Sequence, residues 1–195
     1  VADDEKVYGE NDPEFEDAEI SEYIGEELDG IDLSVSRTNE DEDVDVYEDV
    51  LTIGQTAAQL NALYTNYSFT VENGDFEIKA ASAEDLGLTA TPYNNVYDGQ
   101  PHSITATVSV SDGTTLYYST VDPESDDFEE SNWSTTAPTW TNVTAAQTVY
   151  VKAENANYET AYADATVTIT KKAVTITVAD DEKVYGENDP EFEDA

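Results

Sequence analysis

The chain has 195 residues, with 45 acidic and 7 basic side chains and a formal net charge of −38 at pH 7. So negative a charge repels the phosphates of nucleic acids and of anionic membrane surfaces, which excludes both as expected partners. The sequence has no cysteine and one histidine, which excludes thiol catalysis and metal sites built from several histidines. No apolar run approaches the ~18 residues that a membrane span needs, so we expect no membrane insertion.

An identical stretch of 18 residues opens and closes the sequence. Residues 1–18 and 178–195 both read VADDEKVYGENDPEFEDA, and long repeats of this kind are typical of modular arrays. The second copy follows residues 173–177 (AVTIT), which alternate as a strand does. We therefore expect the first repeat to lack the start of its first strand.

Residues 1–80 read as short strands with one helix. The helix is predicted at residues 56–64, because Thr56 is a good N-cap and apolar residues recur at helical spacing. Asn73 and Gly74 predict a hairpin between residues 68–71 and 76–78. Other strand patterns cover residues 1–8, 15–24, 31–36 and 44–53, with a turn at 9–13.

Ordered motifs in residues 1–80 resemble the MBG domain of the YGX type. They include KVYGENDPEF (6–15), LDG (28–30), EDV (42–44), NY (66–67) and GDFEI (74–78). That family occurs repeatedly in large extracellular bacterial proteins, including adhesin-like ones. The resemblance implies a small, mostly β domain with a β-grasp-like arrangement.

Charge density falls and threonine content rises after residue 80, which indicates a domain boundary. Asp112 and Gly113 predict a turn that connects a strand at 103–110 to a returning strand at 114–120. Further strand patterns cover residues 148–153 and 165–170. Short strands at regular spacing predict a β-sandwich.

This half resembles the bacterial Ig-like modules of surface proteins. The motifs that carry the resemblance include YDGQPHSI (97–104), VYVKA (149–153), NY (157–158) and ATVTI (165–169). We therefore divide the chain into an MBG-type domain at 1–80, an Ig-like β-sandwich domain at 81–172, and the first strand and turn of the next repeat at 173–195.

The resemblances imply a repeat unit of an extracellular protein on the bacterial cell surface, acting as a stalk or adhesive segment. Its partners would then be neighbouring repeats of the same chain. The alternative is an adhesin module that itself recognises mucin, another host glycan or a host protein; a third reading is an accessory module of a carbohydrate-active enzyme. The strand pattern at 173–195 also predicts self-association on a bare sheet edge.

Calcium is the one cofactor that the sequence leaves open, since carboxylates in an acidic loop are able to form an oxygen cage. They are Asp122, Glu124, Asp126 and Asp127. The alternative for these residues is a solvated charged surface.

Trp133 and Trp140 are candidates for stacking on a sugar ring, and the alternative is that one of them is the core tryptophan of a sandwich. We assign no catalytic residue and expect no enzyme. Carboxylate pairs are so numerous that no particular pair indicates a catalytic site, and we expect a structural role for His102. Lys6 and Lys152 are candidates for an internal Lys–Asn bond, which we do not expect to form.

Overall fold

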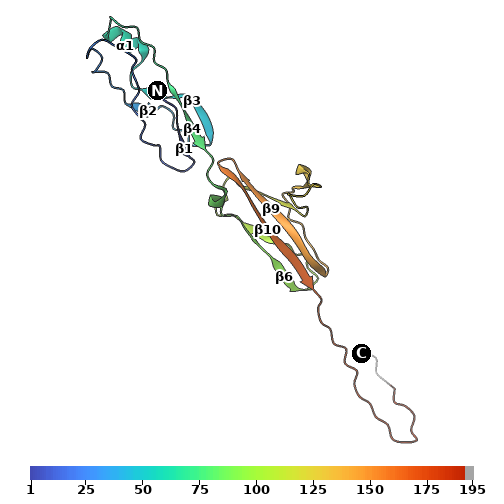
Figure 1. Ribbon diagram of the computed structural model, residues 1–195. Helices are drawn as coiled ribbons and strands as arrows, with labels where there is room; N and C mark the ends of the chain where they lie inside the picture. The colour runs from blue at the N-terminus through green and yellow to red at the C-terminus, as the bar shows by residue number, and fades with distance from the viewer. Residues whose placement is uncertain (192–195) are drawn as a thin grey trace.

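The computed structural model describes residues 1–191, which form two β-rich units joined end to end and a tail that leads away from them (Figure 1). The prediction of a mostly β chain is confirmed. Within the described residues, no helix is long and apolar enough to cross a membrane.

Four strands form the sheet of the first unit in the order β1-β4-β3-β2. β1 runs parallel to β4, with Asp4 opposite Phe76, and β3 runs antiparallel to both β4 and β2. Phe76 and Ile78 on β4 are buried with Leu51 of β3. The bounds are β1 (Asp4–Val7), β2 (Val35–Arg37), β3 (Asp45–Ile53) and β4 (Gly74–Lys79).

The helix α1 (Ala57–Leu63) lies where the sequence predicts it. The Thr56 hydroxyl accepts the Gln59 N–H, and the Gln59 side chain accepts the Thr56 N–H, so the helix begins with a capping box. Leu60 is buried against Leu28, Ile31 and Ile53. This apolar cluster anchors a helix too short to be stable alone.

Three sequence predictions in this unit are wrong. Residues 68–71 do not pair with 76–78, because β1 and β3 already occupy the two edges of β4. Residues 15–24 belong to no strand, and Ala18 instead donates its N–H to the Leu33 carbonyl at 2.8 Å. The strand predicted at 31–36 begins only at Val35, and Ile31 and Leu33 before it pack in the apolar cluster that contains Leu60 of α1.

The second unit has two sheets around a shared core. The larger sheet has the order β6-β10-β9-β8, and the smaller one pairs β5 with β7. Val149, Val151 and Val167 of the larger sheet are buried with Ile104, which precedes β7. The bounds are β5 (Thr89–Thr91), β6 (Tyr93–Val96), β7 (Thr105–Thr107), β8 (Thr115–Ser119), β9 (Thr144–Asn155) and β10 (Tyr158–Thr170), with 3-10 turns η1 (Ala83–Leu86) and η2 (Glu130–Asn132).

The turn at Gly113 forms as predicted, with a φ of 68° that favours glycine. However, the strands on its two sides do not form a hairpin, because β7 pairs with β5 and β8 pairs with β9. The chain crosses from one sheet to the other at this turn.

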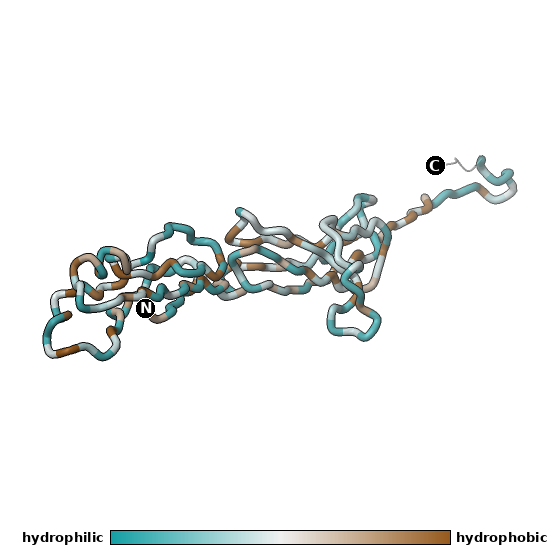
Figure 2. Tube along the Cα trace, turned by 90° about the horizontal axis from the view of Figure 1, so that it is seen from above, coloured by the Kyte–Doolittle hydropathy of each residue, from teal (hydrophilic) through white to brown (hydrophobic). Residues whose placement is uncertain are grey.

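Residues 171–191 leave the end of β10 and pair with no strand in the described part of the chain. Val174, Ile176 and Val178 are all exposed, and Figure 2 shows hydrophobic residues along the tail where it leaves the second unit. The strand predicted at 173–177 is therefore unpaired in this structure, and residues 192–195 of the repeated motif lie outside the described residues.

Candidate functional site

The two units meet at the tip of the β9–β10 hairpin, which we call the junction. The Asn157 side chain accepts the Val44 N–H at 2.9 Å and donates to Asp43 Oδ1 at 2.8 Å. The Tyr158 ring packs edge-on against Tyr8, with ring centroids 5.4 Å apart. One turn of the second unit thus makes both polar and aromatic contacts with the first.

The connecting segment between the units is also fixed to this hairpin. Ala81 donates its N–H to the Asn157 carbonyl at 3.0 Å and accepts the Glu159 N–H at 2.8 Å. Ala81 is itself buried. The connector and the first unit both contact the hairpin tip. Rotation of one unit relative to the other about the connector would therefore break both sets of contacts.

An ion cluster with two buried bases and two partly exposed acids holds the loop that carries Asp43 and Val44. It consists of Lys6 on β1, Arg37 at the end of β2, and the acids Asp12 and Glu42. Asp12 bridges Lys6 Nζ at 2.7 Å and Arg37 Nε at 3.3 Å, and Glu42 pairs with the same two bases. The Arg37 guanidinium also lies 4.9 Å from the centre of the Phe76 ring, a cation–π contact.

Hydrogen bonds from Lys6 and Arg37 lower the pKa of Glu42. Burial alone would lower the pKa of Lys6, but its hydrogen bonds to Asp12 and Glu42 outweigh burial and raise it. Lys6 and Glu42 are therefore both charged at neutral pH. Among the described residues, Lys6 and Lys152 pair with carboxylates and with no asparagine.

A second candidate is an aromatic hollow of about 680 Å³ on the second unit. The rings of Phe128 and Tyr162 both lie near that of Trp133, with centroids 5.5 and 6.4 Å from its centroid. Lys152 Nζ lies 5.2 Å from the centre of the Trp133 ring and pairs with Glu130 and Glu154, each at 2.8 Å. These contacts hold Trp133 in place, while Tyr162 is itself 63% exposed.

The two tryptophans that the sequence analysis proposed for sugar stacking have different environments in the structure. Trp140 packs against the buried core of the second unit, which is the structural alternative stated above. Trp133 lines the hollow instead. His102 stacks on Tyr93 at 4.1 Å and contacts Asp98 at 2.9 Å, which is consistent with a structural role.

The four acidic candidates for calcium do not gather at one point. Asp122 and Glu124 line the hollow, whereas Asp126 and Asp127 do not. Asp122 Oδ1 accepts the Glu124 N–H at 2.9 Å, a local turn contact. Within residues 1–191, no group of three or more metal-ligating side chains is brought together, so calcium binding stays a prediction from the sequence.

No protein-family model matches this chain. No curated protein matches it either. The resemblance to MBG and Ig-like domains therefore stays a prediction that rests on the motifs quoted above.

Sequence reasoning did not identify the junction as a site. Asn157 and Tyr158 stand out in the sequence only as part of a module-like motif, and their partners Asp43 and Tyr8 are more than 100 residues away. An Asn-rich turn between two long strands is a signal for a hairpin tip, but it does not say what the tip contacts.

Proposed function

We propose that this chain is a rigid spacer repeat of an extracellular bacterial surface protein, acting as a stalk or adhesive segment. The junction carries this proposal, since its side-chain contacts and paired connector keep the two units end to end (Figure 1). Linked domains without such contacts are expected to move relative to each other. A fixed junction gives each repeat a defined length.

The charge of the chain supports the same role. With 45 acidic residues against 7 basic ones, neighbouring units repel each other unless specific contacts join them. Repulsion of this kind discourages folding back and aggregation, so a row of such units stays extended.

Small-angle X-ray scattering tests the proposal. We expect the wild-type chain to have the single elongated distance distribution of the end-to-end arrangement. The double variant Asn157→Ala/Tyr158→Ala should have a broader distribution with a shorter mean length, while Asn94→Ala, a substitution far from the junction, should match the wild type. Wild-type scattering that requires freely reorienting units would overturn the proposal.

A second candidate function is binding of a host glycan at the aromatic hollow. It is favoured by Trp133, Phe128 and the exposed Tyr162, which line one opening. Asp122 and Glu124 line the same opening, and their carboxylates can accept hydrogen bonds from sugar hydroxyls. Aromatic rings supply broad, rigid contact area. Such a function would make the repeat itself adhesive.

Glycan-array screening distinguishes this function from a spacer role. We expect Tyr162→Ala to abolish any specific signal, and Tyr97→Ala, which removes a tyrosine outside the hollow, to retain it. A wild-type chain that binds no glycan, including mucin-type glycans, would leave the spacer proposal as the one supported.

A further inference from the structure

The outer face of the larger sheet in the second unit forms one wall of the aromatic hollow. Val149 of β9 and Ala165 of β10 pair with each other and are buried in the core. Side chains alternate along a strand, so the neighbouring pair Tyr150 and Asp164 faces away from the core, as does Tyr162. These three residues line the hollow.

A loop that is fixed to β8 near both of its ends supplies the other wall. The Ser119 hydroxyl donates to the Val121 carbonyl at 2.8 Å where the loop begins. Where it ends, the backbones of Tyr118 and Ser134 exchange hydrogen bonds of 2.7 and 3.0 Å. The loop therefore needs little further ordering when a ligand binds, which favours affinity.

The side chains that line the hollow include four acids and no base. Glu130 pairs with Lys152 beside the hollow. Asp122, Glu124 and Asp164 form no ion pair within residues 1–191. Three carboxylates are therefore uncompensated, and their charge attracts a cation.

Tyr150 shows that these charges act on one place. Burial and a hydrogen bond to Asp122 raise the pKa of Tyr150, and the negative charges of Asp164 and Glu124 raise it further. However, no three acids within residues 1–191 are close enough together to hold a metal ion. This wider arrangement suits an organic cation better than the compact oxygen cage of calcium.

The aromatic side chains favour the same kind of ligand. Lys152 Nζ lies 5.2 Å from the centre of the Trp133 ring, so this ring already contacts one ammonium group as a cation–π partner. Tyr162 is exposed and offers its ring to a ligand from solvent. Such rings attract cations and also provide a flat apolar surface for a sugar ring.

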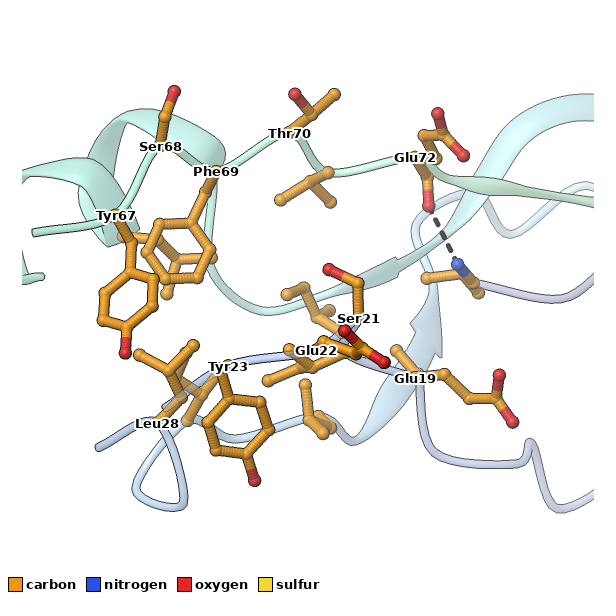
Figure 3. A pocket seen from close by; sticks show the side chains of 18 residues that line it. Glu19, Ser21, Glu22, Tyr23, Leu28, Tyr67, Ser68, Phe69, Thr70 and Glu72 are labelled. Atoms are coloured by element: carbon orange, nitrogen blue, oxygen red, sulfur yellow. Dashed lines mark hydrogen bonds between the residues drawn. The ribbon is translucent and has the colours of Figure 1, made fainter. Parts of the chain in front are cut away.

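The groove of the first unit, which has a volume of about 420 Å³, is a weaker candidate for a small ligand. Its walls are residues 18–23 and 67–72 (Figure 3), and its interior belongs to the apolar cluster around Leu60. The hydroxyls of its two tyrosines already donate to acids of the same chain, Tyr23 to Asp29 at 2.7 Å and Tyr67 to Glu27 at 2.6 Å. These groups are thus engaged in the packing of the first unit.

We propose that the aromatic hollow binds an amino sugar with a free, protonated amine. Ionised carboxylates only accept hydrogen bonds, and an amino sugar donates them from its ammonium group and from its hydroxyls. The apolar face of the sugar ring would lie against Tyr162. Acetylation of the amine removes the positive charge, and a sialylated or sulfated glycan would be repelled by the acids. This inference rests on the proposed glycan-binding function and names its ligand class.

Titration calorimetry with the disaccharide of glucosamine tests the proposal. The N-acetylated disaccharide is the matched ligand, because it has the same rings without the charged amines. At about pH 6, free amines are protonated and carboxylates are ionised. We expect the disaccharide with free amines to bind at least about tenfold more tightly, since hydrogen bonds between charged groups are stronger than those between neutral ones.

Paired variants separate the hollow from the general negative charge of the chain. Asp122→Asn/Asp164→Asn should weaken binding by at least about tenfold, because two charges that face the ligand are lost while the size of both side chains is kept. Asp126→Asn/Asp127→Asn removes the same charge from the loop outside the hollow and should leave the affinity unchanged. Tyr162→Ala, at an exposed position, should also weaken binding.

The possible failures of this proposal differ from those of glycan binding itself. Equal affinity for the two disaccharides, or equal losses in the two pairs of aspartate variants, would overturn the amino-sugar proposal while glycan binding stands. Choline or a lysine dipeptide that binds as tightly as the disaccharide would overturn the assignment to a sugar. A Tyr162-dependent array signal from neutral glycans alone would also overturn the proposal, whereas an array without any signal would overturn glycan binding as well.

Discussion

Replacing Glu42 with Gln tests whether the ion cluster stabilises the first unit. Glu42 pairs with both Lys6 and Arg37, whose side chains are only 4% and 6% exposed. Removing one partner of a fully buried pair costs about 3–5 kcal/mol. The Glu42 side chain is 54% exposed and Asp12 remains beside both bases, so we expect a loss of about 2 kcal/mol in the free energy of unfolding.

For a unit of this size, that loss lowers the Tm by about 8–16 °C. Calorimetry combined with tryptophan fluorescence assigns each thermal unfolding transition to one of the two units, since Trp133 and Trp140 both lie in the second unit. A heat-absorbing transition that leaves tryptophan fluorescence unchanged belongs to the first unit. That transition should shift in Glu42→Gln, and the one seen by fluorescence should shift much less.

Glu40→Gln is the matched control, because Glu40 is exposed and forms no ion pair within residues 1–191. Removing any acid from a chain of net charge −38 relieves general repulsion. General repulsion therefore predicts that both variants are neutral or stabilised, whereas the ion cluster predicts that Glu42→Gln alone is destabilised. Equal Tm values for the two variants would refute the reasoning.

Four further predictions follow from the same structure. The pKa of Glu42 lies below its ordinary 4.5, so the stability difference between wild type and Glu42→Gln should be constant from pH 7 to about 5 and should shrink on further acidification, as pH-dependent unfolding will measure. Gly74→Ala should destabilise the first unit by roughly 2–4 kcal/mol in denaturant unfolding, because the new Cβ meets the Ala2 backbone, whereas Gly54→Ala meets nothing within 4 Å and should change stability little. Added salt should raise the Tm by screening repulsion among the acids, and a flat response would argue against that repulsion. Titration with millimolar calcium should produce heat and a higher Tm if Asp122 and Glu124 bind the ion; the absence of both would end the calcium prediction.

Local signals in the sequence predicted the structure correctly where residues close together in the chain determine it. The α1 helix was predicted from the Thr56 cap and the spacing of Leu60 in the apolar pattern, and the structure adds the reciprocal contact with Gln59. The turn at Gly113 likewise follows from a residue that tolerates positive φ.

Predictions failed where distant segments compete for the same edge. Asn73 and Gly74 favour a hairpin locally, but β1 takes the edge of β4 from 72 residues away. The β7–β8 hairpin fails for the same reason, since β5 and β9 are the partners that complete the two sheets.

Of the candidate sites, the sequence identified Trp133 and two of the hollow's acids but could not group them with Tyr162. The junction depends on Asn157 reaching Asp43 across 114 positions. Periodicity and turn chemistry carry no information on a contact between two separately folded units.

The parallel pairing of terminal strands determines how each unit would respond to a pulling force. β1 begins the first unit and β4 ends it, and the two strands are parallel; in the second unit, β6 near its start is likewise parallel to β10 at its end. Tension applied to the two ends of a unit therefore slides these strands past each other along their length. All hydrogen bonds of the pair then share the load and must break together, instead of opening one by one as in an unzipped hairpin.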